Sequence, residues 1–101
     1  MDTKLLVEQA KLRFAHQIAT DYLQNKYQSK LIVAEQQGLW KIDINLIAFL
    51  ESVNTEFVVM IDQYKVPVRV NVKKLLEIVK SKYDSVMLEW YNEYQSIENK
   101  R

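Results

Sequence analysis

Apolar residues in the last third of the chain recur at helical spacing. From Val72 they follow at steps of three or four residues, at Val72, Leu76, Val79, Tyr83, Val86, Trp90, Tyr94 and Ile97. On a helix these positions form one narrow stripe, which is the spacing that lets one helix lie along another. Asn71 stands just before the stripe and is a favoured N-cap residue. The pattern predicts a long helix over residues 72–98.

The beginning of the chain predicts a second long helix, over residues 4–37. This segment contains no glycine or proline, and Gly38 follows it where a helix would stop. Its apolar arc is broad, because two groups of positions lie side by side on the wheel: Val7, Phe14, Ile18 and Tyr22, and then Leu5, Leu12, Ala15, Ala19 and Leu23. An arc of this width can touch two neighbours at once.

The segment between the long helices contains both strand-like and helix-like patterns of apolar residues. Residues 39–44 alternate apolar and polar side chains, which favours a short strand, and a short helix is expected over residues 44–52 with Asp43 or Asn45 as its cap. Residues 56–70 carry the clearest strand signal, two alternating runs around a loop at residues 62–65. That loop predicts a hairpin with one buried face, made of the pairs Ile61–Val66, Val59–Val68 and Phe57–Val70.

These elements predict a single domain over residues 1–101, of the α+β class and mainly helical. Its order is a long N-terminal helix, a short helix, a β-hairpin and a long C-terminal helix. The two long helices are expected to lie side by side with the hairpin covering one end. A two-stranded hairpin is marginal in water, so it must lie on a helix, gain a strand from residues 39–44 or pair with another chain.

Composition excludes several classes of chemistry. The chain has no cysteine, which removes disulfides, thiolate metal sites and a cysteine nucleophile. Its net charge is only +1, so no global field draws in nucleic acid or an anionic membrane. No apolar run approaches the roughly 18–20 residues that span a bilayer, and the N-terminus lacks a signal-peptide core. We expect a cytoplasmic protein, in a host cytoplasm or virion if it is viral, without membrane contact.

Candidate catalytic and metal-binding groups are sparse. His16 is the only histidine, and no carboxylate lies one helical turn away from it. No HExxH pattern or EF-hand loop occurs, and Glu89 and Glu93, one turn apart, are more typical of a solvated face. A single glycine cannot build a phosphate-binding loop. We therefore predict a protein without catalytic residues, cofactor, metal or small-molecule substrate. A small enzyme would need a pocket that joins His16 to a carboxylate distant in sequence.

Charge is distributed unevenly along the last helix. The basic residues Lys65, Arg69, Lys73, Lys74, Lys80 and Lys82 precede an acidic stretch, residues 84–99, that contains no base. This order opposes the helix macrodipole, which favours anions first and cations last. Two such helices running antiparallel would place basic halves against acidic halves. The alternative hypothesis is a nucleic-acid-binding accessory factor that uses the basic segment of residues 65–82.

The run EFVVMIDQYKVPVRVNVKKLLEIVKSKYDSVMLEWYNEY, a hairpin leading into a helix with tyrosine and tryptophan, resembles small accessory proteins of large tailed bacteriophages over residues 38–98. The resemblance implies a role in virion assembly, or in redirecting a host machine, by protein contact.

Together these patterns predict a non-enzymatic protein–protein interaction module, a structural or assembly subunit that self-associates or docks on a larger complex. The expected contact surface is Ile78, Leu88 and Tyr91 on the last helix with the hairpin edge. The cations Arg69, Lys73 and Lys74 could meet an anionic surface of the partner.

Overall fold

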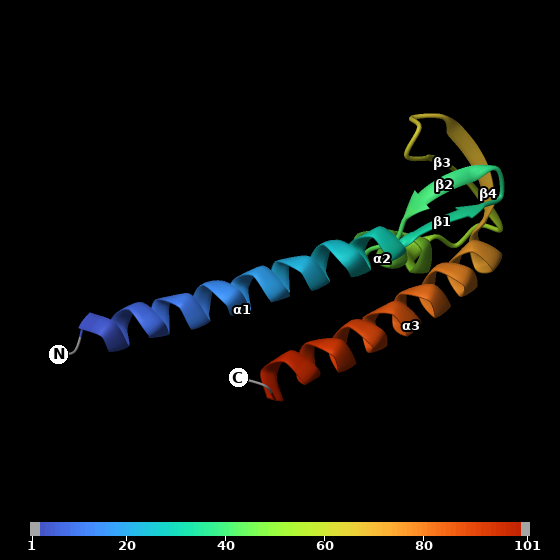
Figure 1. The fold of residues 1–101 in the computed structure, drawn as a ribbon. Coiled ribbons are helices and arrows are strands. Elements are labelled where there is room, and N and C mark those ends of the chain that lie inside the picture. Colours follow the sequence, from blue (N-terminus) through green and yellow to red (C-terminus); the bar gives the residue numbers. More distant parts are fainter. Residues whose placement is uncertain (1–2, 100–101) are drawn as a thin grey trace.

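The computed structural model describes residues 3–99. The elements follow in the order α1 (Thr3–Lys30), β1 (Ile32–Glu35), β2 (Gly38–Lys41), α2 (Ile44–Ser52), β3 (Phe57–Ile61), β4 (Pro67–Asn71) and α3 (Val72–Asn99). The helices α1 and α3 run antiparallel, and the strands with α2 gather at the end where α1 finishes and α3 begins (Figure 1). The predicted α+β, mainly helical class is confirmed.

The first helix ends earlier than predicted. It stops at Lys30, and residues 32–41 form a hairpin in which Val33 pairs with Trp40 and Glu35 with Gly38. The β-branched Ile32 and Val33 favour a strand over a helix. The turn of this hairpin is made by Gln36 and Gln37, which both adopt positive φ, 51° and 66°. Two-residue hairpin turns of this kind usually carry Asn-Gly, so Gln-Gln left no turn signal in the sequence.

Gly38 is therefore the first residue of β2 and not a helix stop. Its φ is not positive. The position needs glycine because the indole of Trp40 lies over it: a Cβ added there would meet Cζ2 of Trp40 at 2.5 Å.

The second hairpin forms where predicted, but one residue out of the predicted register. Ile61 pairs with Pro67, Met60 with Val68 and Val58 with Val70. The side chains of β3 that turn toward the core are therefore Val58 and Met60, whereas Phe57, Val59 and Ile61 face outward. On β4 the predicted inward residues Val68 and Val70 are buried, and Val66 is exposed because it belongs to the loop.

Asp62 explains the longer loop and holds the two hairpins together. Its Oδ1 accepts hydrogen bonds from the backbone N–H of Tyr64 and Val66, at 2.9 and 3.1 Å, and its own N–H donates to the Val66 carbonyl. Its Oδ2 accepts from the Leu39 N–H of β2 at 3.1 Å. The backbone hydrogen bonds from Val66, Leu39 and Tyr64 outweigh burial and lower the pKa of this carboxyl group. The hairpins remain two separate sheets, joined by this side chain and by the Gln63 N–H, which donates to the Leu39 carbonyl at 2.9 Å.

The core lies at the end of the molecule that carries the hairpins. Its most deeply buried side chains come from β2 and the segment after it, α2, β4 and α3: Ile42, Leu50, Val70, Leu75 and Val79. The two predicted caps are confirmed, since Asp43 Oδ1 accepts from Leu46 N–H at 2.7 Å and Asn71 Oδ1 accepts from Lys74 N–H at 3.1 Å. The C-terminal end of α1 contributes Leu23 and Tyr27, and Leu31 follows directly after the helix.

Candidate functional site

The seam between α1 and α3 accounts for the acidic half of the last helix. Glu93 of α3 pairs with Lys26 at 3.0 Å and Glu89 pairs with Lys30 at 3.5 Å. The hydrogen bond from Lys26, followed by one from Tyr27, lowers the pKa of Glu93. Basic and acidic segments of antiparallel helices do meet, as the charge pattern suggested, but the partner of the acidic half is the first helix of the same chain.

Aromatic packing accompanies these ion pairs. The rings of Tyr27 and Trp90 stack with centroids 6.0 Å apart and planes within 10°. The ammonium groups of Lys26 and Lys30 lie 5.2 and 5.0 Å from the centre of the Tyr27 ring. The seam is thus well defined over the last two turns of α1.

The described part of α3 ends near His16, and α1 continues beyond it (Figure 1). Nε2 of His16 lies 3.3 Å from Oε1 of Glu98, and the Tyr94 hydroxyl donates a hydrogen bond to the same oxygen at 2.8 Å. Every residue from 3 to 15 is exposed. This segment, the N-terminal arm, extends past the end of α3 for about 20 Å at 1.5 Å per residue (Figure 1).

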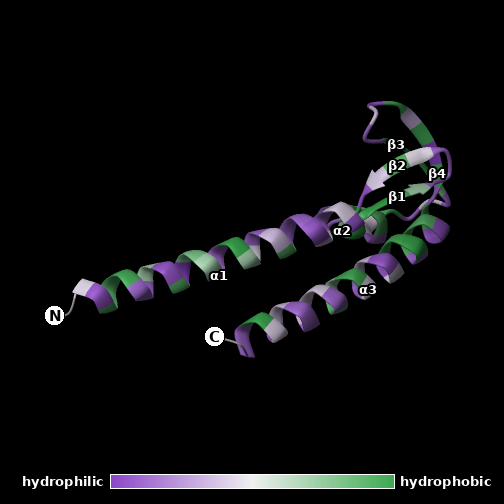
Figure 2. Ribbon diagram, viewed as in Figure 1, coloured by the Kyte–Doolittle hydropathy of each residue, from purple (hydrophilic) through white to green (hydrophobic). Residues whose placement is uncertain are grey.

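One side of α1 is apolar and uncovered along much of the helix. Val7, Phe14, Ile18 and Tyr22, here called the free stripe, are 47%, 69%, 53% and 65% exposed. The side of α1 that packs on α3 is a different one, which carries Leu23 and Tyr27. Figure 2 shows hydrophobic positions recurring along α1 toward its N-terminal end. Of the broad arc seen in the sequence, only Ala19 and Leu23 are partly or fully buried, whereas Leu5 and Leu12 are exposed like the free stripe.

A second apolar surface is the outer face of the β3–β4 hairpin. The register places Phe57, Val59 and Ile61 there, and they are 40%, 63% and 69% exposed. The guanidinium of Arg69 lies 4.3 Å from the centre of the Phe57 ring, which covers part of that ring. This face is shorter than the free stripe and partly capped.

The contact residues predicted on α3 form a smaller exposed apolar surface than the free stripe does. Leu88 and Tyr91 are exposed, at 61% and 60%, whereas Ile78 is half-buried. The residues of the free stripe were not among the predicted contacts. The signal that pointed to them was the width of the apolar arc on the first helix.

The predicted cationic residues do not converge on one surface. Lys73 and Lys82 are nine residues apart on α3, so they point to opposite sides of that helix. Lys80 pairs with Glu51 at 3.3 Å, and Arg69 is held over Phe57. Lys73 and Lys74 are exposed at the start of α3.

The structure brings His16 to a carboxylate distant in sequence, which is the pairing a small enzyme would need. A groove of about 510 Å³ lies beside it, lined by Gln9, Leu12, Arg13, Ala15, His16, Ala19 and Ile97. These residues supply carbon, amide, guanidinium and imidazole groups, and none of them is a nucleophile that the histidine could activate. The His16–Glu98 pair fastens the end of α3 to α1.

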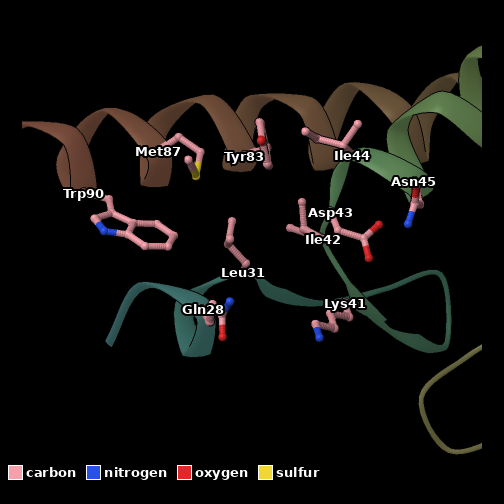
Figure 3. A pocket seen from close by; sticks show the side chains of 10 residues that line it. All are labelled: Gln28, Leu31, Lys41, Ile42, Asp43, Ile44, Asn45, Tyr83, Met87 and Trp90. Carbon is pink, nitrogen blue, oxygen red and sulfur yellow. The ribbon is translucent and has the colours of Figure 1, made fainter. Parts of the chain in front are cut away.

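A smaller pocket, of about 370 Å³, opens between α3 and the segment around Ile42 (Figure 3). Its floor contains Leu31, Met87 and Trp90, and its rim carries Lys41 and Asp43. Asp43 already caps α2. The pocket is therefore a mainly apolar depression, which is better suited to receive a partner's side chain than to carry out a reaction.

Comparisons with protein-family models, curated proteins and solved structures found no match to this chain. Among residues 3–99 no group of three or more His, Cys, Asp or Glu side chains could hold a metal ion. No helix within that range has the length and apolar character needed to cross a bilayer.

Proposed function

We propose that this protein is a protein–protein interaction module, a structural or assembly subunit that uses the outer side of α1 as its contact surface. The observation that carries the proposal is the free stripe. Its four side chains lie on one side of a helix and each is about half exposed or more. Phe14, Ile18 and Tyr22 follow one another at steps of four residues, and Lys11 separates them from Val7. Exposed apolar surface of this kind is typical of interaction sites.

The shape of the molecule supports the same proposal. The radius of gyration is 19.3 Å and the longest dimension is 65 Å. A compact domain of this length has a radius of gyration near 13 Å. The two 28-residue helices elongate the molecule, and the N-terminal arm extends it further because it projects beyond α3. A partner that covers the arm would remove its apolar side chains from water, at about 25 cal/mol for each Å² buried.

The resemblance to phage accessory proteins fits an assembly role but assigns no residue to the site. The nucleic-acid alternative is weaker, because phosphate binding favours a basic patch on one face and the cations here are dispersed.

The proposal is tested by charging the free stripe. Phe14→Glu and Ile18→Glu place a carboxylate among its apolar side chains without touching the core, since both residues are more than half exposed. We expect either change to abolish association of the full-length chain, measured by sedimentation velocity and by affinity capture with identification of bound proteins.

Leu88→Glu is the matched control, because Leu88 is similarly exposed, at 61%, but lies on α3. It should leave association unchanged. If the Phe14→Glu and Ile18→Glu variants associate as well as the parent chain, the free stripe is not the contact surface and the proposal is wrong.

A further inference from the structure

We infer that the partner of the free stripe is the same stripe of a second copy of this chain, packed antiparallel. This inference rests on the proposed function and names its partner. It follows from the order of residues on the exposed side of α1, from their charges and from the area available.

The side of α1 that carries the free stripe has the spacing of a helix-pairing interface. Val7, Phe14 and Asp21 repeat every seven residues, and Lys11, Ile18 and Asn25 each follow four residues later. Two columns at this spacing are the a and d positions of a helix pair. All six residues lie within α1 and are exposed. These two columns are therefore exposed along most of α1.

Antiparallel packing about a two-fold axis near residue 16 gives these columns complementary neighbours. Phe14 then lies opposite Ile18 of the second copy, and by symmetry Ile18 lies opposite Phe14. The next layer outward on each side places Lys11 opposite Asp21. The outermost layers place Val7 opposite Asn25. Apolar side chains thus meet at the centre of the interface, and a Lys11–Asp21 pair lies on each side of them.

The charges select this orientation. Within residues 3–99 neither Lys11 nor Asp21 forms an ion pair, and Asp21 accepts a hydrogen bond only from its neighbour Gln17, at 2.9 Å. Packing in parallel and in register would place each Lys11 against the other copy's Lys11 and each Asp21 against Asp21. Such like-charge contacts are unfavourable, whereas the antiparallel arrangement makes every one of them attractive.

The available area suits a dimer. Overlap of residues 4–28 in both copies makes a helix pair of about 38 Å. An aromatic side chain presents roughly 150–250 Å², so Phe14 and Tyr22, which flanks the two columns, supply roughly 400–670 Å² over two copies at about two-thirds exposure. With the rest of the stripe the pair approaches the ~1,000 Å² total that specific interfaces bury.

Charge reversal in the full-length chain tests the arrangement. We expect the parent protein to sediment as a dimer. Lys11→Asp and Asp21→Lys should each raise the dimer dissociation constant about tenfold or more, because each reversal creates two like-charge contacts. The double variant K11D/D21K should recover most of the lost affinity. Arg13→Asp, which makes the same charge change on another side of the arm, should have little effect.

The possible outcomes separate this inference from the proposed function. If Phe14→Glu dissociates the dimer but neither charge reversal weakens it, the antiparallel register is wrong and the proposed contact surface is retained. If the parent chain stays monomeric up to millimolar concentration, the inference is wrong. The contact surface is then tested by whether it captures a different protein. A dimer that Phe14→Glu does not weaken overturns both.

Discussion

At the scale of single residues, the first hairpin is held by contacts that offset an unfavourable turn. Gln36 and Gln37 both adopt positive φ, which costs about 1–2 kcal/mol for a residue with a side chain. Gln36 compensates by pairing with the backbone of Asn71: its Oε1 accepts at 2.6 Å and its Nε2 donates at 3.2 Å. The indole N–H of Trp40 donates to the Glu35 carbonyl at 2.9 Å.

Two substitutions in this turn should have opposite effects on stability. Gly38→Ala should lower the free energy of unfolding by about 1–3 kcal/mol, because the added methyl group meets the Trp40 indole. Gln37→Gly should raise it by up to about 1 kcal/mol, since glycine adopts positive φ without strain. Urea denaturation followed by tryptophan fluorescence measures both. Equal stability of the two variants would contradict the turn geometry.

At the scale of elements, one carboxylate joins two hairpins that share no ladder. Asp62 is 7% exposed and accepts from backbone N–H groups of its own loop and of β2. A neutral acid or an amide accepts such donors less well than a carboxylate does. The relative placement of the hairpins therefore depends in part on the charge of this side chain, beside the Gln36–Asn71 pair and the Gln63–Leu39 backbone hydrogen bond.

This dependence should appear as acid sensitivity. The folded-state pKa of Asp62 is lowered, so the carboxylate stabilises the fold above its unfolded pKa near 3.9 and this contribution is lost as pH falls below that value. We expect the unfolding free energy to decrease below about pH 4.

Asp62→Asn should be less stable at neutral pH and should show a smaller loss on acidification. Part of the pH dependence should persist, because the pKa of Glu93 is lowered too. Denaturation curves at a series of pH values measure the difference. Parallel stability profiles for parent and variant would show that Asp62 does not contribute.

At the scale of the whole molecule, the core and the proposed contact surface lie apart. The most deeply buried side chains gather where α1 ends and α3 begins, and the N-terminal arm contributes none of them. The domain can therefore fold around its core while the arm stays free to meet a partner.

The arm should be protected from hydrogen exchange only when it is covered. Isolated helices shorter than about 12–15 residues are marginal in water, and the arm spans residues 3–15. In the Phe14→Glu variant we expect its amides to exchange much faster than those of residues 19–30, which lie against α3 or the core. In an associated parent chain this contrast should shrink. Strong protection of the arm in the monomeric variant would contradict its solvent exposure.

Much of the fold could be predicted because it depends on local patterns. The apolar stripe from Val72 onward, the Asn71 and Asp43 caps and the alternation of residues 56–70 each specify an element through its own period. The first hairpin could not be predicted this way, since Gln36 and Gln37 are poor turn residues and are supported by Asn71, a residue distant in sequence. The register of the β3–β4 hairpin was predicted wrongly because every residue of β3 is apolar, so alternation alone could not indicate which face of the strand is buried.

By itself the amino-acid sequence determined the class of the fold, the presence of two long helices and the caps that begin α2 and α3, because period and capping act within one element. Only the tertiary structure decided where α1 ends, which face of β3 is buried, and that the acidic half of α3 is neutralised by Lys26 and Lys30. It also decided which apolar stripe stays uncovered. Burial depends on what packs against a helix, and α3 reaches only part of α1 and only one of its sides.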